Sequence, residues 1–309
     1  RMPSSVAGSR CQSSKRLPRG DIRRAISTIN NVQPRKCCVM SEVEWARLKA
    51  HELRALAEQN AVVIIPTAAI EQHGPHLPVM TDMRIGHEIA VRAARKAFAT
   101  RPTLVTPVMW SGLSEHHMAF GGTLTLDHET YFQVLKCLVQ SLVRHGFRDI
   151  VLSNSHGGNI VANQATADRL GREAGAVIVA ANYVSEAGEA FAEILEDQPH
   201  IMHACEGETS MMMALEGDLV DDSELGTLAT PRGRGPLSAG KASFRWRPYT
   251  CASGNGLTGD PGRATAAKGR RLLEAAAEAI AALITDPETW AEPEDRRPDA
   301  IKGVGFRQA

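Results

Sequence analysis

The sequence predicts an α/β fold in which helices cover both faces of a largely parallel sheet. Short apolar segments rich in β-branched residues alternate with longer amphipathic segments, which is typical of βαβ units. The 309 residues are 43% hydrophobic, which is enough to form one large core. We therefore expect a single domain over residues 40–309.

The predicted elements follow one another along the chain. A first helix is expected over residues 42–59, where Trp45, Leu48 and Leu53 lie near helical spacing. A buried strand follows at 61–66, and Pro66 is expected to end it. Further strands are expected at 103–110, 149–155 and 176–184. Further helices are expected at 81–98, at 127–145, from Asn159 onward, at 208–215 and at 263–284.

Two segments differ from the rest in composition. Residues 1–39 carry nine of the 35 Lys and Arg residues, and Asp21 is their only acid. This composition is that of a transit peptide or of a non-native extension, and we favour a basic, disordered extension. Residues 225–260 are rich in Gly and Pro, and we expect a long functional loop or a subunit contact there.

Charge and cysteine content narrow the class of protein. The formal net charge is zero, so the chain lacks the strongly basic surface that nucleic-acid binding needs. No run of about 18 apolar residues is present, so no membrane span is expected. The six cysteines form no CxxC pair, which indicates free thiols and a cytoplasmic location. We therefore expect a small-molecule partner.

The densest group of chemically reactive side chains follows the first predicted strand. Glu71 and His73 are two residues apart, so an extended chain points both side chains the same way. A glycine and two prolines then shape an irregular backbone that can turn Asp82 back toward them. Two carboxylates and an imidazole at a strand end are typical ligands of a first-row metal ion.

Two further segments carry candidate site residues. His156 follows the strand 149–155 in a turn where two glycines permit a close approach of the backbone. Loops after parallel strands share one edge of the sheet, so we expect His156 beside the first group. Glu208 lies at a predicted helix start and His203 five residues earlier, a pair suited to a metal ligand and a proton shuttle.

Each candidate also has a purely structural explanation. His156 could be a hydrogen-bonded residue at a strand end, and Asp82 could be only a helix N-cap. Glu208 could be an acid that the helix dipole favours in a first turn. We expect His76 to hydrogen-bond backbone or to line the pocket, and we expect Cys205 not to act as a nucleophile.

These residues resemble the motifs of the creatininase (creatinine amidohydrolase) family. The first matching segment is Glu71–Pro78 with Asp82. The others, in the same order along the chain, are 112–117 with 120–123, 154–159, 203–210, and 259–261 with Ala264 and Gly269. The match spans about residues 45–285, which is nearly all of the chain without the basic extension.

The resemblance implies a three-layer α/β/α sandwich and one or two divalent metal ions (Zn, Mn or Fe) per subunit. By this resemblance, Glu71 and His156 hold one ion and His73 holds the other. Asp82 bridges the two ions, and His203 passes a proton to the leaving nitrogen. The resemblance also implies a homo-oligomer, which we expect to be a hexamer.

The turn after His156 departs from the family pattern. Creatininase carries there a tyrosine and then a metal-binding glutamate, whereas this chain has Gly157 and Gly158. Glu208 is the candidate for the missing carboxylate, both as a ligand and in catalysis. Creatininase also has a Trp–Asp pair where this chain has Pro–His at 199–200. Creatinine is therefore a poor candidate substrate.

The resulting prediction is a metal-dependent amidohydrolase that cleaves a non-peptide C–N bond of a small cyclic or linear amide. Metal ions would lower the pKa of a bound water, and the resulting hydroxide would attack the amide carbon. Ser114, His116, His117 and Gly157 are expected to bind the substrate. A formamide deformylase of the same family is the alternative enzyme. A binding or assembly protein is the alternative of another class, although structural metal sites are usually cysteine-rich.

Overall fold

The computed structural model describes residues 42–229 and 244–298. The basic extension and residues 230–243 of the expected loop lie outside the described residues. Four parallel strands form one sheet in the order β2-β1-β3-β4. They are β1 (Val62–Thr67), β2 (Thr103–Val105), β3 (Asp149–Asn154) and β4 (Val177–Asn182). The predicted parallel sheet is confirmed.

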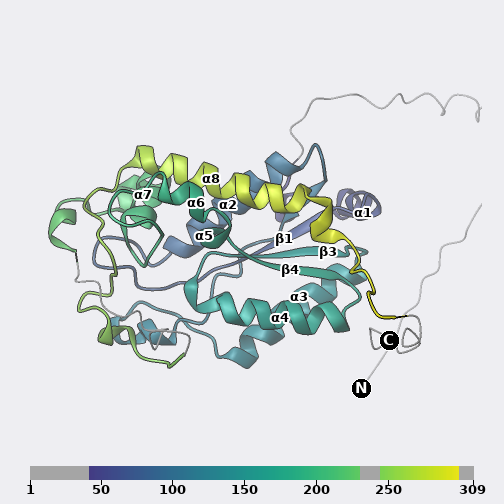
Figure 1. The fold of residues 1–309 in the computed structure, drawn as a ribbon, viewed down its shortest axis with the longest axis horizontal. Helices are drawn as coiled ribbons and strands as arrows, with labels where there is room; N and C mark the ends of the chain where they lie inside the picture. Colours follow the sequence, from purple (N-terminus) through teal and green to yellow (C-terminus); the bar gives the residue numbers. More distant parts are fainter. Residues whose placement is uncertain (1–41, 230–243, 299–309) are drawn as a thin grey trace, which may run out of the picture. The chain divides into compact units, whose positions relative to one another are not determined.

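Helices cover both faces of this sheet, with α2, α7 and α8 on one side and α3 and α4 on the other (Figure 1). The α-helices are α1 (Ala50–Glu58), α2 (Thr81–Ala97), α3 (His128–Arg144), α4 (Ile160–Glu173), α5 (Tyr183–Glu186), α6 (Gly188–Ala192), α7 (Glu206–Glu216) and α8 (Ala266–Thr285). Short 3-10 helices lie at Trp45–Arg47, Glu115–Phe120, Gly157–Asn159, Gly217–Leu219, Leu225–Thr227, Tyr249–Cys251 and Pro287–Trp290. No described helix has both the length and the apolar character needed to cross a membrane.

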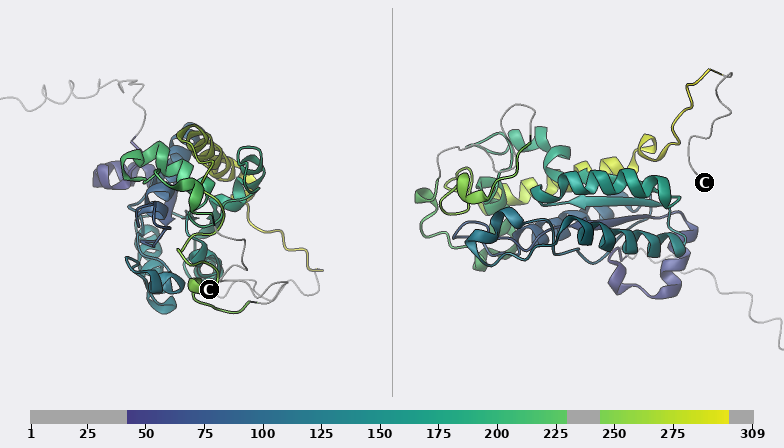
Figure 2. Two further views of the ribbon diagram at one scale, coloured as in Figure 1. Left: turned by 90° about the vertical axis from the view of Figure 1, so that its left-hand side faces the viewer. Right: turned by 90° about the horizontal axis from the view of Figure 1, so that it is seen from below.

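The side chains of β1 supply both hydrophobic cores. Val62 and Ile64 pack in the core formed with α2, α7 and α8, whereas Val63 and Ile65 pack in the core formed with α3 and α4. Successive side chains of a strand point to opposite faces, so a continuous apolar run serves both layers. Seen from below, α3 and α4 run side by side along their face (Figure 2).

The helix predicted over residues 42–59 is divided in two. It consists of the 3-10 turn Trp45–Arg47 and α1, because Leu48 between them is extended, with φ −93° and ψ 153°. The Trp45 ring packs on Phe147 with 5.2 Å between ring centroids. The apolar spacing that predicted one helix therefore reflects two short segments packed on the same core.

Two strand ends also differ from the prediction. β1 continues through Pro66, which pairs with Ser153 of β3. The ring nitrogen of Pro66, which carries no hydrogen, faces the side of β1 on which β2 lies. Because β2 has already ended after three residues, no backbone hydrogen bond of the sheet is lost. The predicted strand 103–110 is also shorter than expected, since regular pairing with β1 ends at Val105 and returns only at the isolated bridge between Met109 and Thr67.

Helix α8 packs closely on α7 at Gly269. A Cβ atom placed on Gly269 would lie 1.8 Å from the backbone oxygen of Ser210. Because the obstructing atom belongs to the backbone of a helix, it cannot rotate away as a side chain can.

Replacing this glycine is expected to destabilise the protein. Gly269→Ala should lower the free energy of unfolding by about 1–3 kcal/mol, because α7 and α8 must move apart. Gly171→Ala in α4 is the matched control, since no atom lies within 4 Å of its added Cβ. Alanine is the better helix former, so this control should be neutral or more stable by up to about 1 kcal/mol. Urea unfolding measures both, and equal stability of the two variants would contradict the close packing.

Candidate metal centre

The candidate site lies at the carboxyl ends of β1 and β3. After β1 the chain forms a loop closed by a hydrogen bond from the Glu71 N–H to the Val79 carbonyl oxygen (3.0 Å). Gly74 has φ +62°, a left-handed conformation that favours glycine, and it lets the loop turn between His73 and Leu77. This turn places the loop that contains Glu71 and His73 close to the first turn of α2.

Asp82 lies between two imidazoles. It is 3% exposed in the first turn of α2, where Met80 is the N-cap residue. Oδ1 of Asp82 lies 3.1 Å from Nε2 of His73, and Oδ2 lies 2.9 Å from Nδ1 of His156. Burial alone would raise the pKa of Asp82, but the two imidazoles hold it below its usual value. The alternative that Asp82 serves only as an N-cap is therefore wrong.

A backbone carbonyl fixes which nitrogen of His73 faces the carboxylates. Nδ1 lies 2.9 Å from the carbonyl oxygen of Glu71 and donates to it, so Nε2 faces Asp82. Nε2 also lies 3.7 Å from Oε2 of Glu208, which comes from the first turn of α7. Burial alone would lower the pKa of His73, but the surrounding carboxylates raise it to about 10.

His156 contacts both carboxylates of the site through its two nitrogens. Nδ1 faces Asp82, and Nε2 lies 3.5 Å from Oε2 of Glu71. Nε2 also lies 3.2 Å from the Leu113 carbonyl oxygen and 3.2 Å from Oγ of Ser114. Burial alone would lower the pKa of His156, but Glu71 and Asp82 raise it to about 9.

Four imidazoles surround the carboxylate of Glu71, which is 1% exposed. Nδ1 of His203 and Nε2 of His117 lie 3.3 Å and 3.5 Å from Oε1. Nε2 of His156 and Nε2 of His116 lie 3.5 Å and 3.7 Å from Oε2. Within the described part of the chain, Oε2 of Glu71 and Nε2 of His117 are buried without a hydrogen-bond partner. Burial raises the pKa of Glu71 to about 7.

Gln72 orients two of these imidazoles. Its carbonyl oxygen accepts from Nε2 of His203 (2.7 Å), and its Oε1 accepts from Nδ1 of His117 (3.4 Å). The Gln72 amide is held in turn by donation to the Asn255 carbonyl oxygen (3.0 Å). Gly256 makes room for it, since a Cβ there would lie 2.0 Å from Oε1. Both rings therefore present an unprotonated nitrogen to the carboxylate.

These donors fit a divalent cation. Lone pairs of Glu71, His117 and His203 face one another in a buried space, an arrangement that is costly unless positive charge lies between them. Ligand atoms lie within 4.8 Å of one another in three groups: Glu71–His116–His156, Glu71–His73–His203 and His73–Asp82–Glu208. Their nitrogen and oxygen donors suit a first-row ion such as Zn, Mn or Fe.

The site opens into a cavity of about 310 Å³. Its walls include Glu71, Asp82, His116, His117, Gly157, His203, Glu208 and Tyr249. The Tyr249 ring lies 4.0 Å from the His117 ring, and its hydroxyl is 2.7 Å from Oγ1 of Thr258. Sequence reasoning missed both Tyr249 and Gln72, because Tyr249 lies outside every recognised motif and Gln72 acts through its contacts with distant residues.

Two residues that the sequence associated with the site, Ser114 and His76, do not line the cavity. Ser114 is completely buried, contacts His156 and does not line the cavity. His76 does not reach the cavity either, since its Nε2 lies 2.8 Å from Oγ1 of Thr209. Burial raises the pKa of the Cys205 thiol to about 12, which agrees with the expectation that it is no nucleophile.

A family model described as creatinine amidohydrolase (creatininase) matches residues 46–284. This chain belongs to the creatininase family. A mycofactocin precursor peptide peptidase from Mycobacterium tuberculosis is 31% identical over 233 residues, which cover 71% of this chain and 83% of that one. Creatinine amidohydrolase from Pseudomonas putida is 31% identical over 202 residues, which cover 60% and 75%. A solved creatininase variant described as the Zn–Zn type has 26% identity and a TM-score of 0.66, covering 79% and 97%.

The likeness confirms the α/β/α fold and identifies the protein as a creatininase-family hydrolase. The matched region contains every residue of the candidate metal centre. The zinc of the solved variant belongs to that protein, and the donors described above are the independent evidence for a metal ion in this one.

Metal binding by this creatininase-family hydrolase is expected to release protons. Without an ion, the pKa values of about 10 and 9 keep His73 and His156 protonated at pH 7. A metal ligand must be unprotonated, so each ring that binds the ion gives up a proton and affinity falls as the pH decreases. Calorimetric titration with Zn²⁺ in buffers of different ionisation enthalpy measures this release. An affinity that is the same at pH 6 and pH 8 would contradict the prediction.

Proposed function

We propose that this creatininase-family hydrolase cleaves a non-peptide amide C–N bond of a small molecule with one or two divalent metal ions. The observation that carries the proposal is the Glu71 carboxylate, buried among four imidazoles yet on the wall of an open cavity. Structural metal sites are usually closed and cysteine-rich. The donor groups found among the described residues contain no cysteine. This favours catalysis over a binding or assembly role.

The proposed ligands follow from the atoms that face one another. His73, Asp82 and Glu208 would hold one ion. Glu71 and His156 would hold a second, beside the same Asp82 carboxylate. Bound ions would supply an activated water for attack on the amide carbon and positive charge beside the developing oxyanion.

His203 is placed to move a proton. Its Nε2 donates to the Gln72 carbonyl oxygen, so its Nδ1 faces Glu71 at the cavity wall. Burial and the neighbouring imidazoles hold the pKa of His203 well below its usual value, so Nδ1 is unprotonated at neutral pH. In the proposed reaction Nδ1 takes a proton from the attacking water and returns it to the leaving nitrogen.

The class of bond is supported by the relatives, and the size of the substrate by the cavity. One relative is named for creatinine amidohydrolysis and another for deformylation of a formylamino compound, and both names support an amide bond. Others are named for a precursor peptide and for 3-dehydro-scyllo-inosose, so the relatives do not share a substrate. A cavity of about 310 Å³ suits a small amide. Gly157 leaves one wall open, because a Cβ there would meet no atom within 4 Å.

A substrate screen tests the proposal. The protein loaded with Zn, Mn or Fe is expected to hydrolyse a member of a panel of cyclic ureides, lactams and formamides, and to leave dipeptides intact as the peptide-bond control. Release of amine or formate is the readout, and formate from formamides alone would identify a deformylase. Removal of the metal with a chelator should abolish turnover, and its return should restore turnover. Full activity of the metal-free protein would refute the proposal.

Two substitutions separate the ligand from the proton shuttle. Glu208→Gln should lose metal, because a neutral amide is a far weaker ligand than a carboxylate. His203→Asn should keep its metal but lose roughly 10²–10⁴-fold in turnover, the usual contribution of general acid–base catalysis. Metal analysis and turnover of both variants are the measurements. Metal lost from His203→Asn and kept in Glu208→Gln would show that the two roles are reversed.

A further inference from the structure

We infer that His116 is a metal ligand, which with Glu71 and His156 holds the second ion. The inference rests on the proposed function, since it concerns the ions that the reaction would use. His116 was expected to bind the substrate, and the geometry points instead to a direct role in the metal centre.

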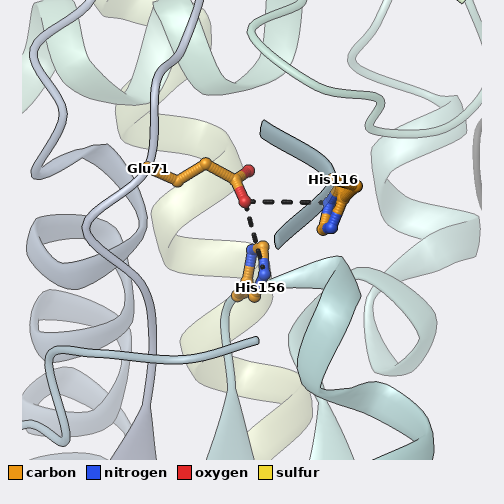
Figure 3. Close-up of side chains that lie close together, drawn as sticks. All are labelled: Glu71, His116 and His156. Carbon is orange, nitrogen blue, oxygen red and sulfur yellow. Dashed lines mark ion pairs between the residues drawn. The ribbon is translucent and has the colours of Figure 1, made fainter. Parts of the chain in front are cut away.

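The first observation is the direction of the imidazole. Figure 3 shows His116 and His156 converging on the same oxygen of Glu71. Nε2 of His116 lies 3.7 Å and Nε2 of His156 lies 3.5 Å from Oε2 of Glu71. That oxygen is buried and has no hydrogen-bond partner in the described part of the chain. The separations are too long for hydrogen bonds and leave room for an ion among the three atoms.

The second observation is the crowding at Gly158. A Cβ atom there would lie 2.2 Å from the Leu113 carbonyl oxygen, 2.5 Å from Nε2 of His156 and 3.1 Å from Cε1 of His116. A side chain at position 158 could therefore enter the site only by displacing the Leu113 backbone or His156. The His116 ring occupies the adjoining space and stacks on His156 at an interplanar angle of 13°, with 5.8 Å between centroids.

The segment that carries His116 is firmly held. The Leu113 N–H donates to Oδ1 of Asn159 (3.0 Å), and the Ser114 N–H donates to Oγ1 of Thr125 (2.9 Å). His116 is 6% exposed, and its Nε2 lies 3.7 Å from Oε2 of Glu71. A fixed imidazole beside an unpaired carboxylate oxygen is the chemistry that a divalent ion needs.

The number of ligands completes the case. His73, Asp82 and Glu208 form one group of three donors. Without His116, the second ion would have only Glu71 and His156 as ligands of its own. With His116 it also has three, which is the usual number of protein ligands in a catalytic zinc site. His116 thus gives the second ion a third protein ligand of its own.

Zinc binding to the full-length protein tests the inference. Wild-type protein is expected to bind two Zn²⁺ ions per subunit. His116→Ala should keep one and bind the other at least about 100-fold more weakly, because even indirect partners of a ligand contribute 10–100-fold. His116→Asn, a smaller change of shape, should behave in the same way. His51→Ala is the control, since His51 is an exposed residue of α1.

Metal analysis after dialysis gives the number of ions, and titration against a chromogenic chelator gives each affinity. The absorption spectrum of the Co²⁺-loaded protein adds a readout that depends on the ligands rather than on turnover. Two ions with unchanged affinity and an unchanged Co²⁺ spectrum in both His116 variants would overturn the role of His116 and leave the proposed function intact. A wild-type protein that binds no ion would overturn the proposed function as well.

Discussion

The buried carboxylate of Asp82 is the constraint on which the rest of the site depends. A carboxylate removed from water costs several kcal/mol unless it is paired, and Asp82 is paired with an imidazole on each side. One imidazole follows β1 and the other follows β3, so a single carboxylate at the start of α2 joins both strand ends. The Ser155 hydroxyl, which donates to the Asp82 carbonyl oxygen (2.9 Å), strengthens the same junction.

Hydrogen bonds to backbone carbonyl oxygens then determine which nitrogen of an imidazole faces the carboxylates and could bind a metal ion. The Glu71 carbonyl accepts from Nδ1 of His73, and the Gln72 carbonyl accepts from Nε2 of His203. Each bond leaves the opposite nitrogen of the ring facing a carboxylate. Since both carbonyls belong to the same short loop, the conformation of that loop sets the donor pattern of two imidazoles.

The similarity to the creatininase family extends over the whole candidate site. The family model covers residues 46–284, which include the donor residues at the ends of β1 and β3 and the turn 156–158. In our proposal Gly158 matters because a Cβ there would collide with the Leu113 carbonyl oxygen and with His156 and would crowd the His116 ring. Gly157, which precedes Gly158, leaves one wall of the cavity open, since a Cβ there would meet no atom within 4 Å.

Local patterns in the sequence determined the parallel sheet and the candidate metal-binding motif that follows β1. Apolar runs and the spacing of Glu71 and His73 act within a few residues, and backbone geometry alone turns them into structure. The tertiary structure decided that Ser114 contacts His156 and that Gln72 orients His117, because these pairs are separated by 42 and 45 residues. The tertiary structure also decided which nitrogen of each imidazole faces a carboxylate. Such contacts depend on how loops that are far apart in the sequence come together at one edge of the sheet. No local sequence pattern specifies that arrangement.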